Sequence, residues 1–311
     1  MLSLGLDTSC YTTSAALCTS HGEIVQSRRL LPVKTGERGL RQSEAVFAHV
    51  RQLAAQVENV MQQAREPLAC VCASVAPCDG QDSYMPVFSV GEMAGRAIAA
   101  AHHVPFFTTT HQRGHIRAAR VDTGLKSSRF LALHLSGGTT DVLMMDGDAL
   151  TPLGTSVDLH AGQLVDRVGV AMGLPFPSGP HLEKMAVLGT AKALVPVNVN
   201  ENSLSCHLSG AEAQLMRMIK GDMNRNDIAA EVYDVLCRTV LRLLSAAADR
   251  HGTRDILLAG GVASSQLFRK KVLERNEKRR LHLNLHFGRP EYSGDNAVGV
   301  ALIGLEKLQG G

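Results

Sequence analysis

The chain has 311 residues, of which 45% are hydrophobic and 20% are charged, and its formal net charge at pH 7 is +3. This ordinary globular mixture excludes a disordered or fibrous protein, and the small charge does not by itself indicate a nucleic-acid binder. Because the length exceeds the usual size of one hydrophobic core, two domains or two closely packed lobes are expected.

The first part of the chain alternates short apolar strands with helices. Strands are predicted over residues 2–6, 12–18, 23–30, 68–75 and 105–110, and helices over 42–64 and 87–102. The first strand runs into Asp7-Thr8-Ser9, a polar turn that precedes the second strand. Together these elements make one complete lobe over residues 1–120.

The second part of the chain repeats this opening after a polar and basic linker at 121–128. Strands are predicted over 130–135, 142–145 and 256–259, and helices over 159–172, 228–250 and 295–308. An irregular Pro/Gly stretch at 175–180 begins a helical insertion near 175–221. The second lobe therefore spans 129–294, and the last helix, which is apolar on most faces, is a candidate to pack on the first lobe.

The fold class follows from this repetition. Each half begins with a strand, a short turn of Ser, Thr, Gly and Asp residues, and a second strand, which is an internal repeat of architecture. Two copies of one lobe around a cleft predict an α/β protein with the two-lobed fold of actin, the sugar kinases and the Hsp70 nucleotide-binding domain, built from two duplicated RNase H-like lobes. We expect such a protein to bind ATP in the cleft.

The cysteines and the apolar runs bear on where the protein works. Seven cysteines are scattered without a C-x-x-C pair, so neither a disulfide framework nor a zinc ribbon is indicated. The N-terminus lacks a basic segment followed by a long apolar run, and nowhere do eighteen consecutive apolar residues occur. We therefore expect a cytoplasmic protein that is neither exported nor inserted into a membrane.

Two turns are candidate phosphate-binding sites. Thr8-Ser9 and Ser136-Gly137-Gly138-Thr139-Thr140 each follow a strand, where backbone N–H groups and hydroxyls can face an anion. Each could also be a simple hairpin turn. Their repetition in both halves favours phosphate binding, and Gly260-Gly261 adds bare backbone that a nucleoside can approach. Asp166, about one helical turn after Gly162, is placed to project toward the cleft and to accept hydrogen bonds from ligand hydroxyls.

One histidine pair has the spacing of metal ligands. His111 and His115 are four residues apart, so they share one face if the segment is helical. The pair could instead be chance or surface pairing, because two ligands do not make a site. Asp295, which follows Tyr292-Ser293-Gly294, is a candidate third ligand and equally a candidate N-cap of the last helix.

Seven short motifs occur in the order and separation typical of one known family. They are Gly5-Leu-Asp-Thr-Ser-Cys10, His111-Gln-Arg-Gly-His115, Leu133-His-Leu-Ser-Gly-Gly-Thr139, Pro177-Ser-Gly-Pro180, Leu208-Ser-Gly210, Ala259-Gly-Gly-Val262 and Tyr292-Ser-Gly-Asp-Asn296. On these motifs the chain resembles, nearly end to end, the universal tRNA adenosine threonylcarbamoyltransferase family, historically mislabelled O-sialoglycoprotein endopeptidase. The order of the motifs is more specific than any one of them.

The resemblance implies a set of ligands and partners. It implies one divalent metal ion, iron or zinc, bound by His111, His115 and Asp295, and it implies ATP or threonylcarbamoyl-adenylate in the cleft. The nucleotide contacts of the family fall on Ser136, Gly137, Gly138, Thr139, Asp166, Gly179, Glu183 in place of an aspartate, Gly260, Gly261, and Ser265 in place of an asparagine. It also implies tRNA and the partner proteins of the threonylcarbamoyladenosine pathway, without a membrane, and it leaves a dimer open.

The chain departs from the family pattern at positions that bear on catalysis. Tyr11 and Thr12 stand where the family carries acidic residues, so no carboxylate is available there to handle a proton. Arg113 replaces the glutamate between the two family histidines, and the glycine-rich loop of the first lobe is rewritten over 77–84. These changes alter acid–base features, whereas the metal and phosphate motifs remain.

Two functions follow from the motifs and the departures. The first is metal-dependent transfer of a threonylcarbamoyl group from its adenylate to adenosine 37 of ANN-decoding tRNAs. The alternative is a divergent paralogue that binds metal and ATP, and that carbamoylates another acceptor or acts as a non-catalytic partner. A sugar or acid kinase shares the fold, but it does not explain the histidine pair with a distant aspartate. We therefore expect an acyltransferase, and the missing acidic pair is the feature that favours the alternative.

Overall fold

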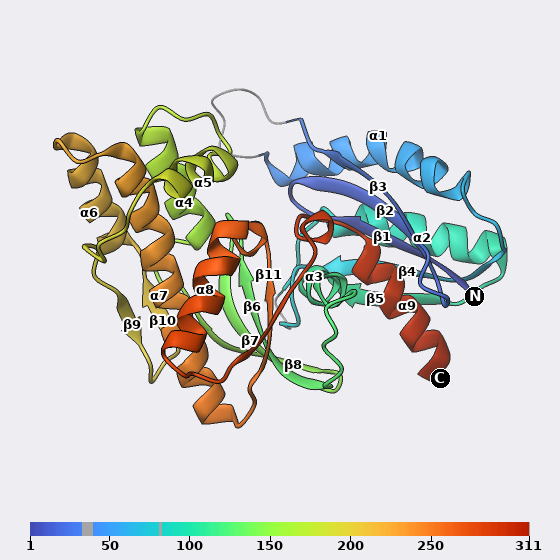
Figure 1. Ribbon diagram of the computed structural model, residues 1–311. Helices are drawn as coiled ribbons and strands as arrows, with labels where there is room; N and C mark the ends of the chain where they lie inside the picture. The colour runs from blue at the N-terminus through green and yellow to red at the C-terminus, as the bar shows by residue number, and fades with distance from the viewer. Residues whose placement is uncertain (33–39, 81–82, 311) are drawn as a thin grey trace. The chain divides into compact units, whose positions relative to one another are not determined.

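The computed structural model describes residues 1–32, 40–80 and 83–310, and its contacts divide the chain into two compact units. The first unit comprises Met1–Val121 and Gly294–Gly311, and the second comprises Asp122–Ser293. Each unit is built around one five-stranded sheet that helices accompany (Figure 1).

The sheet of the first unit has the strand order β3-β2-β1-β4-β5. Its strands are β1 (Leu2–Thr8), β2 (Thr12–Thr19), β3 (Ile24–Leu30), β4 (Leu68–Ala76) and β5 (Phe106–Thr110). The first three strands are antiparallel neighbours, whereas β4 runs parallel to β1 and β5 runs parallel to β4. Every residue of β1 and β2 is buried, as expected of strands that are covered on both faces. All five strands predicted for this part of the chain are confirmed.

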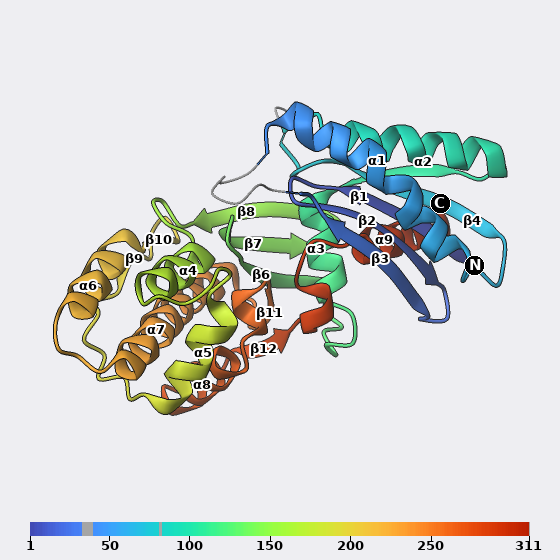
Figure 2. The same cartoon turned by 90° about the horizontal axis from the view of Figure 1, so that it is seen from above.

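Helices cover both faces of the first sheet (Figure 2). These helices are α1 (Gln42–Met61), α2 (Phe88–His102), α3 (His111–Ala119) and α9 (Val298–Gly310). The face that carries Leu2, Leu4 and Leu6 packs against α1 and α2 in one apolar core, because alternate residues of a strand point to the same side. The opposite face packs against α9, which also contacts α3. The C-terminal helix therefore belongs to the unit that the N-terminal strands begin.

The sheet of the second unit repeats the topology of the first. Its strand order is β12-β11-β6-β7-β8, and its strands are β6 (Arg129–Leu135), β7 (Thr140–Asp146), β8 (Ala149–Thr155), β11 (Asp255–Ala259) and β12 (Asn284–Phe287). The strands β6, β7 and β8 are antiparallel neighbours, and β11 and β12 continue the sheet in parallel. This arrangement confirms the predicted duplication, although the two edge strands β8 and β12 were not predicted.

A long central helix organises the rest of the second unit. This helix, α7 (Arg225–His251), begins at the N-cap Asn224 and ends at Gly252, whose φ of 64° is the left-handed conformation common after a helix. It contacts four others (Figure 1): α4 (Ala161–Ala171), α5 (Gly179–Leu188), α6 (Ser209–Lys220) and α8 (Gln266–Lys278). Buried residues of these helices and of the sheet form one apolar core.

The segment predicted as irregular and helical is more ordered than expected. The stretch at 175–180 runs into α5, because Pro180 occupies the first helical turn, where a missing N–H costs no hydrogen bond. A short hairpin of β9 (Asn198–Asn200) and β10 (Ser205–His207) separates α5 from α6, and two 3₁₀ turns, η1 (Val262–Ser264) and η2 (Pro290–Tyr292), complete the unit. Across both units, none of the helices that the structure describes combines the length and the apolarity needed to cross a membrane.

Candidate functional site

The histidine pair lies at the start of α3. Thr110, the last residue of β5, is the N-cap of this helix, and its Oγ1 accepts a hydrogen bond from Arg113 N at 3.4 Å. His111 is therefore the first helical residue, and His115 follows one turn later on the same face. The condition under which the two histidines share one face, a helical segment, is therefore met.

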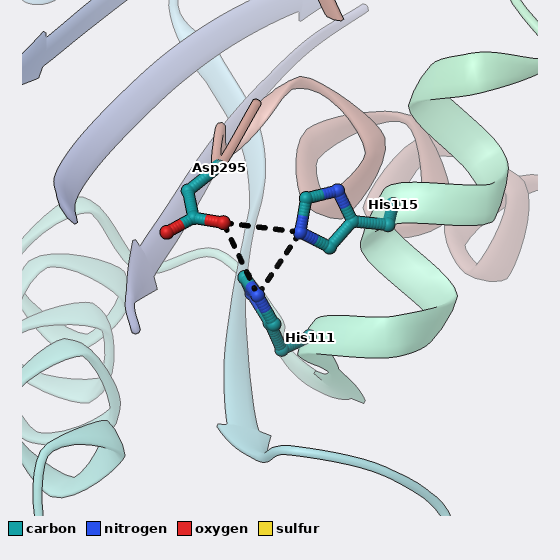
Figure 3. Close-up of side chains that lie close together, drawn as sticks. All are labelled: His111, His115 and Asp295. Carbon is teal, nitrogen blue, oxygen red and sulfur yellow. Dashed lines mark hydrogen bonds and ion pairs between the residues drawn. The ribbon is translucent and has the colours of Figure 1, made fainter. Parts of the chain in front are cut away.

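Asp295 meets both histidines (Figure 3). The Nε2 atoms of His111 and His115 are 3.0 Å apart, and Asp295 Oδ1 lies 3.6 Å from the first and 3.3 Å from the second. One ligand atom from each residue thus lies within 4.8 Å of the other two. The interpretation of Asp295 as an N-cap is wrong, because α9 begins at Val298, whose N–H donates to Asn296 Oδ1 at 3.0 Å.

Two polar residues, Asp7 of β1 and Ser9 of the turn that follows it, form hydrogen bonds to this cluster. His111 Nδ1 lies 3.0 and 3.1 Å from the two oxygens of the buried Asp7, which also accepts a short hydrogen bond from the Ser74 hydroxyl. Because a carboxylate only accepts, Nδ1 of His111 carries a proton, and Nε2 faces the other two groups. Ser9 Oγ donates to Asp295 Oδ2 at 2.9 Å, so Oδ1 is the oxygen that faces the histidines.

The charges of the cluster reinforce one another. Burial by itself would lower the pKa of His111, but Asp7 and Asp295 outweigh it and raise that pKa well above its usual range. Burial would raise the pKa of Asp295, yet the hydrogen bonds and charges of His111 and His115 hold it well below its usual range. The carboxylates of Asp7 and Asp295 therefore favour a positive charge at this cluster.

The donor set fits a divalent transition metal. Two imidazole Nε2 atoms and one carboxylate oxygen are ligands that zinc and iron accept, and three protein ligands leave coordination positions open for another group. The Asp7 carboxylate on the far ring nitrogen of His111 is the outer contact that metal-binding histidines usually have. His111, His115 and Asp295 could hold such an ion together.

Two departures from the family pattern contact each other. Arg113 Nε donates to both oxygens of Asp79, at 2.9 and 2.8 Å, and Asp79 also accepts from Thr110 Oγ1 at 2.9 Å. A second hydrogen bond joins the same loop to α3: Gln112 N donates to the Pro77 carbonyl at 2.9 Å. The rewritten loop thus anchors the first turn of α3, and the Arg113 charge is paired there. Residues 81 and 82 of this loop lie outside the described residues.

Both hydroxyls of the turn after β1 are engaged within the protein. Thr8 Oγ1 donates to the Val87 carbonyl at 2.9 Å and accepts Gly91 N at 3.2 Å, so it holds the start of α2, while the Ser9 hydroxyl holds Asp295. Tyr11 is 56% exposed, whereas Thr12 is 3% exposed within the sheet. The two positions of the missing acidic pair therefore differ, and only Tyr11 can take a charged side chain without burying it.

The turn after β6 in the second unit is tightly closed. Ser136 Oγ accepts Gly138 N at 3.2 Å and Thr139 N at 3.1 Å, and Ser136 N donates to the Thr139 carbonyl at 2.9 Å. At Gly137 and Gly138 an added Cβ would meet no atom within 4 Å. The glycines therefore leave the backbone of this turn bare toward open space, which suits the close approach of a ligand.

The two glycines after β11 have different roles. Gly260 has a φ of 95°, and an added Cβ would lie 2.2 Å from the Leu135 carbonyl oxygen, so this residue must be glycine for structural reasons. At Gly261 an added Cβ would meet nothing within 4 Å. Because β11 pairs with β6 in parallel, this turn lies beside the Ser136 turn at the same edge of the sheet.

The remaining predicted contacts gather around Tyr233. Asp166 Oδ1 accepts Ser178 N at 2.7 Å at the start of α5, Glu183 Oε1 accepts Leu267 N at 2.8 Å, and Ser265 Oγ accepts Phe268 N at 3.1 Å at the start of α8. The buried Tyr233 hydroxyl donates to the Gly179 carbonyl at 3.2 Å and is also hydrogen-bonded to Ser265. Burial raises the pKa of Asp166 despite the N–H groups that it accepts. These side chains thus accept backbone N–H groups at the starts of helices, and the predicted contact of Asp166 with ligand hydroxyls stays a prediction.

Sequence reasoning missed three residues that hold these sites together: Asp7, Asp79 and Tyr233. Asp7 had a visible signal, because a carboxylate near the end of an otherwise apolar strand is unusual unless it is paired. Asp79 and Tyr233 had none, since each acts on a residue far along the chain.

Comparison with known proteins gives one consistent description. The family model described as tRNA N6-adenosine threonylcarbamoyltransferase matches residues 23–302. A curated relative with the same description, from Prochlorococcus marinus (strain MIT 9313), is 27% identical over 330 residues, which cover 99% of this chain and 91% of the relative.

Solved structures extend the likeness at the level of the fold. HypF from T. kodakarensis superposes with a TM-score of 0.63 at 16% identity, over 99% of this chain and 47% of that one. A ROK family glucokinase from Streptomyces griseus superposes with a TM-score of 0.57 at 12% identity, over 98% of this chain and 100% of that one. Identities this low show the fold alone, and they confirm the predicted actin, sugar-kinase and Hsp70-like class.

Proposed function

The chain belongs to the tRNA N6-adenosine threonylcarbamoyltransferase family and is an acyltransferase-type enzyme, and from this we propose that it transfers a threonylcarbamoyl group from its adenylate to adenosine 37 of tRNA with the help of a bound metal. The observation that carries the metal part is the cluster of His111, His115 and Asp295 with their outer contacts. The kinase-like fold by itself would not require that cluster.

The proposed metal is one iron or zinc ion held by these three residues. When bound, such an ion polarises a carbonyl or phosphoryl oxygen and stabilises the negative charge that develops there during acyl transfer. The residues of the chain supply the rest: Asp7 orients His111, and Ser9 orients Asp295, so that the ligand atoms face one another before a substrate arrives.

The proposed place for the nucleotide is the second unit. The bare turns at Ser136–Thr139 and at Gly260–Gly261 lie at one edge of the sheet, where backbone can approach phosphates and the nucleoside closely. We propose that the remaining lone pairs of four acceptors hold the sugar hydroxyls: the Asp166, Glu183 and Ser265 side chains and the Gly179 carbonyl. ATP and threonylcarbamoyl-adenylate share the groups that these contacts would recognise.

The transfer itself is a balanced acyl substitution. The N6 amine of adenosine forms a bond to the carbamoyl carbon, the bond from that carbon to the phosphate oxygen breaks, AMP leaves, and the amine loses one proton. The proposed substrate is an ANN-decoding tRNA, and the proposed partners are the pathway proteins that make and deliver the adenylate. We also propose that the chain can form a dimer, with such a protein or with a second copy. We further propose a cytoplasmic location, because the seven free cysteines suit a reducing compartment.

A reconstituted reaction tests this function. We expect the purified chain, with its pathway partners, threonylcarbamoyl-adenylate and an ANN-decoding tRNA, to form modified adenosine 37, which nucleoside mass spectrometry measures. Because Tyr11 supplies no carboxylate, Tyr11→Asp should raise the rate, and a positioned acid–base group contributes about 10²–10⁴-fold in favourable cases. The structure favours this single change, since Thr12→Glu would bury a charge.

The matched control for that experiment is Phe47→Asp. Phe47 is another exposed aromatic residue, at 63%, so its replacement changes the net charge equally and should leave the rate unaltered. If no modified adenosine forms with any variant while the metal remains bound, the transferase proposal is wrong and another acceptor must be sought.

Nucleotide binding gives a separate test. ATP or a non-hydrolysable adenylate analogue should raise the melting temperature, because a ligand at 100 times its Kd stabilises the native state by about 2.7 kcal/mol. Gly138→Val and Gly261→Val should abolish this shift and leave the ligand-free melting curve unchanged, since an added Cβ at either position meets no protein atom. Differential scanning fluorimetry measures both effects.

Gly260→Ala is the informative contrast to Gly261→Val. Its Cβ would collide with the Leu135 carbonyl, so it should lower the melting temperature even without nucleotide. A full nucleotide shift in the Gly138 and Gly261 variants would place the nucleotide elsewhere.

A further inference from the structure

A buried histidine behind the metal cluster has no role in the proposed chemistry. His49 lies on α1 and is fully buried beneath the turn that follows β1. Both of its ring nitrogens are engaged, and their partners come from that turn and from β2. Relying on the proposed metal site, we propose that His49 is a positioning residue that acts through Ser9 to hold Asp295 in the geometry that binds the ion.

The contacts of His49 define its direction of action. His49 Nε2 lies 2.8 Å from the Ser9 carbonyl oxygen, and because a carbonyl only accepts, Nε2 carries the proton. Burial lowers the pKa of His49, and Nδ1 is hydrogen-bonded to the Thr13 hydroxyl 2.7 Å away, which also donates to Gln52 Oε1 at 3.0 Å. The ring therefore ties both ends of the turn over residues 9–13 to α1.

Ser9 passes this constraint to the metal ligand. Its carbonyl is held by His49, and its hydroxyl donates to Asp295 Oδ2 at 2.9 Å. Because Oδ2 is occupied in this way, Oδ1 faces the two histidine Nε2 atoms. If the carbonyl loses its partner, the buried turn must shift to find another, and the hydroxyl moves with it. The orientation of Asp295 thus depends on a helix that contributes no ligand.

A purely space-filling role makes a different prediction. If His49 only filled the core, a leucine of similar volume would serve as well, and the affinity of the site for metal would not change. The positioning role instead requires a donor where Nε2 lies. Glutamine can place its amide N–H near that position, whereas the shorter asparagine reaches only the neighbourhood of Nδ1. His49→Gln should therefore preserve the site, and His49→Asn should not.

The experiment titrates Co²⁺ alone into the metal-free full-length chain and follows the d–d absorption of the bound ion, which reports its ligand geometry. Loss of an outer contact to a metal ligand typically weakens binding about 10–100-fold, so Ser9→Ala should lose affinity on that scale and alter the spectrum. His49→Leu and His49→Asn, which act through Ser9, should lose affinity by up to the same factor, and His49→Gln should preserve most of it. The double variant His49→Leu/Ser9→Ala should be no weaker than Ser9→Ala, because both changes remove one linkage.

Gln56→Leu is the matched control. Gln56 is another buried polar residue of α1, and its contacts go to Ser27 and to the backbone of its own helix, away from the turn. Its replacement should lower thermal stability without changing Co²⁺ affinity.

The outcomes distinguish failure of the proposed metal site from failure of the positioning role of His49. If the wild-type chain binds no Co²⁺, the proposed metal site fails. If the wild type binds and His49→Leu and Ser9→Ala bind equally well with the same spectrum, the positioning role is overturned. If His49→Leu does not fold, the comparison of Gln with Asn still decides, because equal affinities for those two variants contradict the role assigned to Nε2.

Discussion

Replacing His111, His115 or Asp295 with alanine should leave a purified chain without stoichiometric metal. Each change removes one of three protein ligands, and a site with two ligands retains a divalent ion poorly. The loss of an outer contact can weaken metal binding about 100-fold, and the loss of a ligand should lower the metal affinity by more than that. Elemental analysis of the purified variants and titration with Zn²⁺ measure the loss, and tRNA modification should disappear with the metal.

The control for the metal-site variants is His102→Ala. His102 is an exposed histidine at the end of α2, so its removal tests whether surface imidazoles contribute to the measured metal content. Full metal content in the Asp295→Ala variant would reject the three-residue site, because that ligand comes from a separate part of the chain.

Gly299→Ala is expected to be the most destabilising single methyl group that can be added near the site. Helices α3 and α9 touch at this residue: an added Cβ would lie 1.8 Å from the Gly114 carbonyl oxygen and 2.7 Å from Ala118 N. The helices would have to separate, which should lower the free energy of unfolding by about 3 kcal/mol, the upper part of the usual range for overpacking. Chemical denaturation measures this change.

The same variant should weaken metal binding. Asp295 lies three residues before the start of α9, and both histidines are on α3, so a wider spacing between the helices moves the carboxylate away from the imidazoles. Gly210→Ala provides the contrast, because its Cβ would meet no atom and alanine in a helix stabilises by about 0.5–1 kcal/mol over glycine. A Gly299→Ala protein that unfolds at the wild-type denaturant concentration would contradict the observed packing.

The pairing of Arg113 with Asp79 changes the meaning of one departure from the family pattern. An arginine between the two histidines could be expected to repel a metal ion or to neutralise a carboxylate restored at position 11. Because Asp79 holds the guanidinium by two hydrogen bonds, and its own pKa is lowered by that partner in spite of burial, the charge is compensated locally. The arginine at position 113 and the rewritten loop that carries Asp79 therefore compensate each other in the structure.

The missed elements have a common physical cause. The strand β8 contains Pro152 and Gly154 and its pairing with β7 shifts register near Val142, so it lacks the regular alternation that marks a strand. The strand β12 has four residues and lies at the sheet edge, and α5 begins within a Pro/Gly motif that resembles a loop. In each case neighbouring elements stabilise a backbone state that the local residues only weakly favour.

The sequence by itself determined what depends on neighbours along the chain. The strands of the first unit and the long helix α7 follow from periodicity and capping, which act within a few residues. The spacing of His111 and His115 puts both on one face once the segment is helical. The residue pattern alone left Asp295 as either a ligand or an N-cap, and only the family resemblance favoured the ligand. The tertiary structure places Asp295 beside both histidines, because the close approach of α9 to α3 at Gly299 sets where Asp295 lies. Asp7, Asp79 and His49 likewise gained their roles from packing, since each bonds a residue that folding alone brings near.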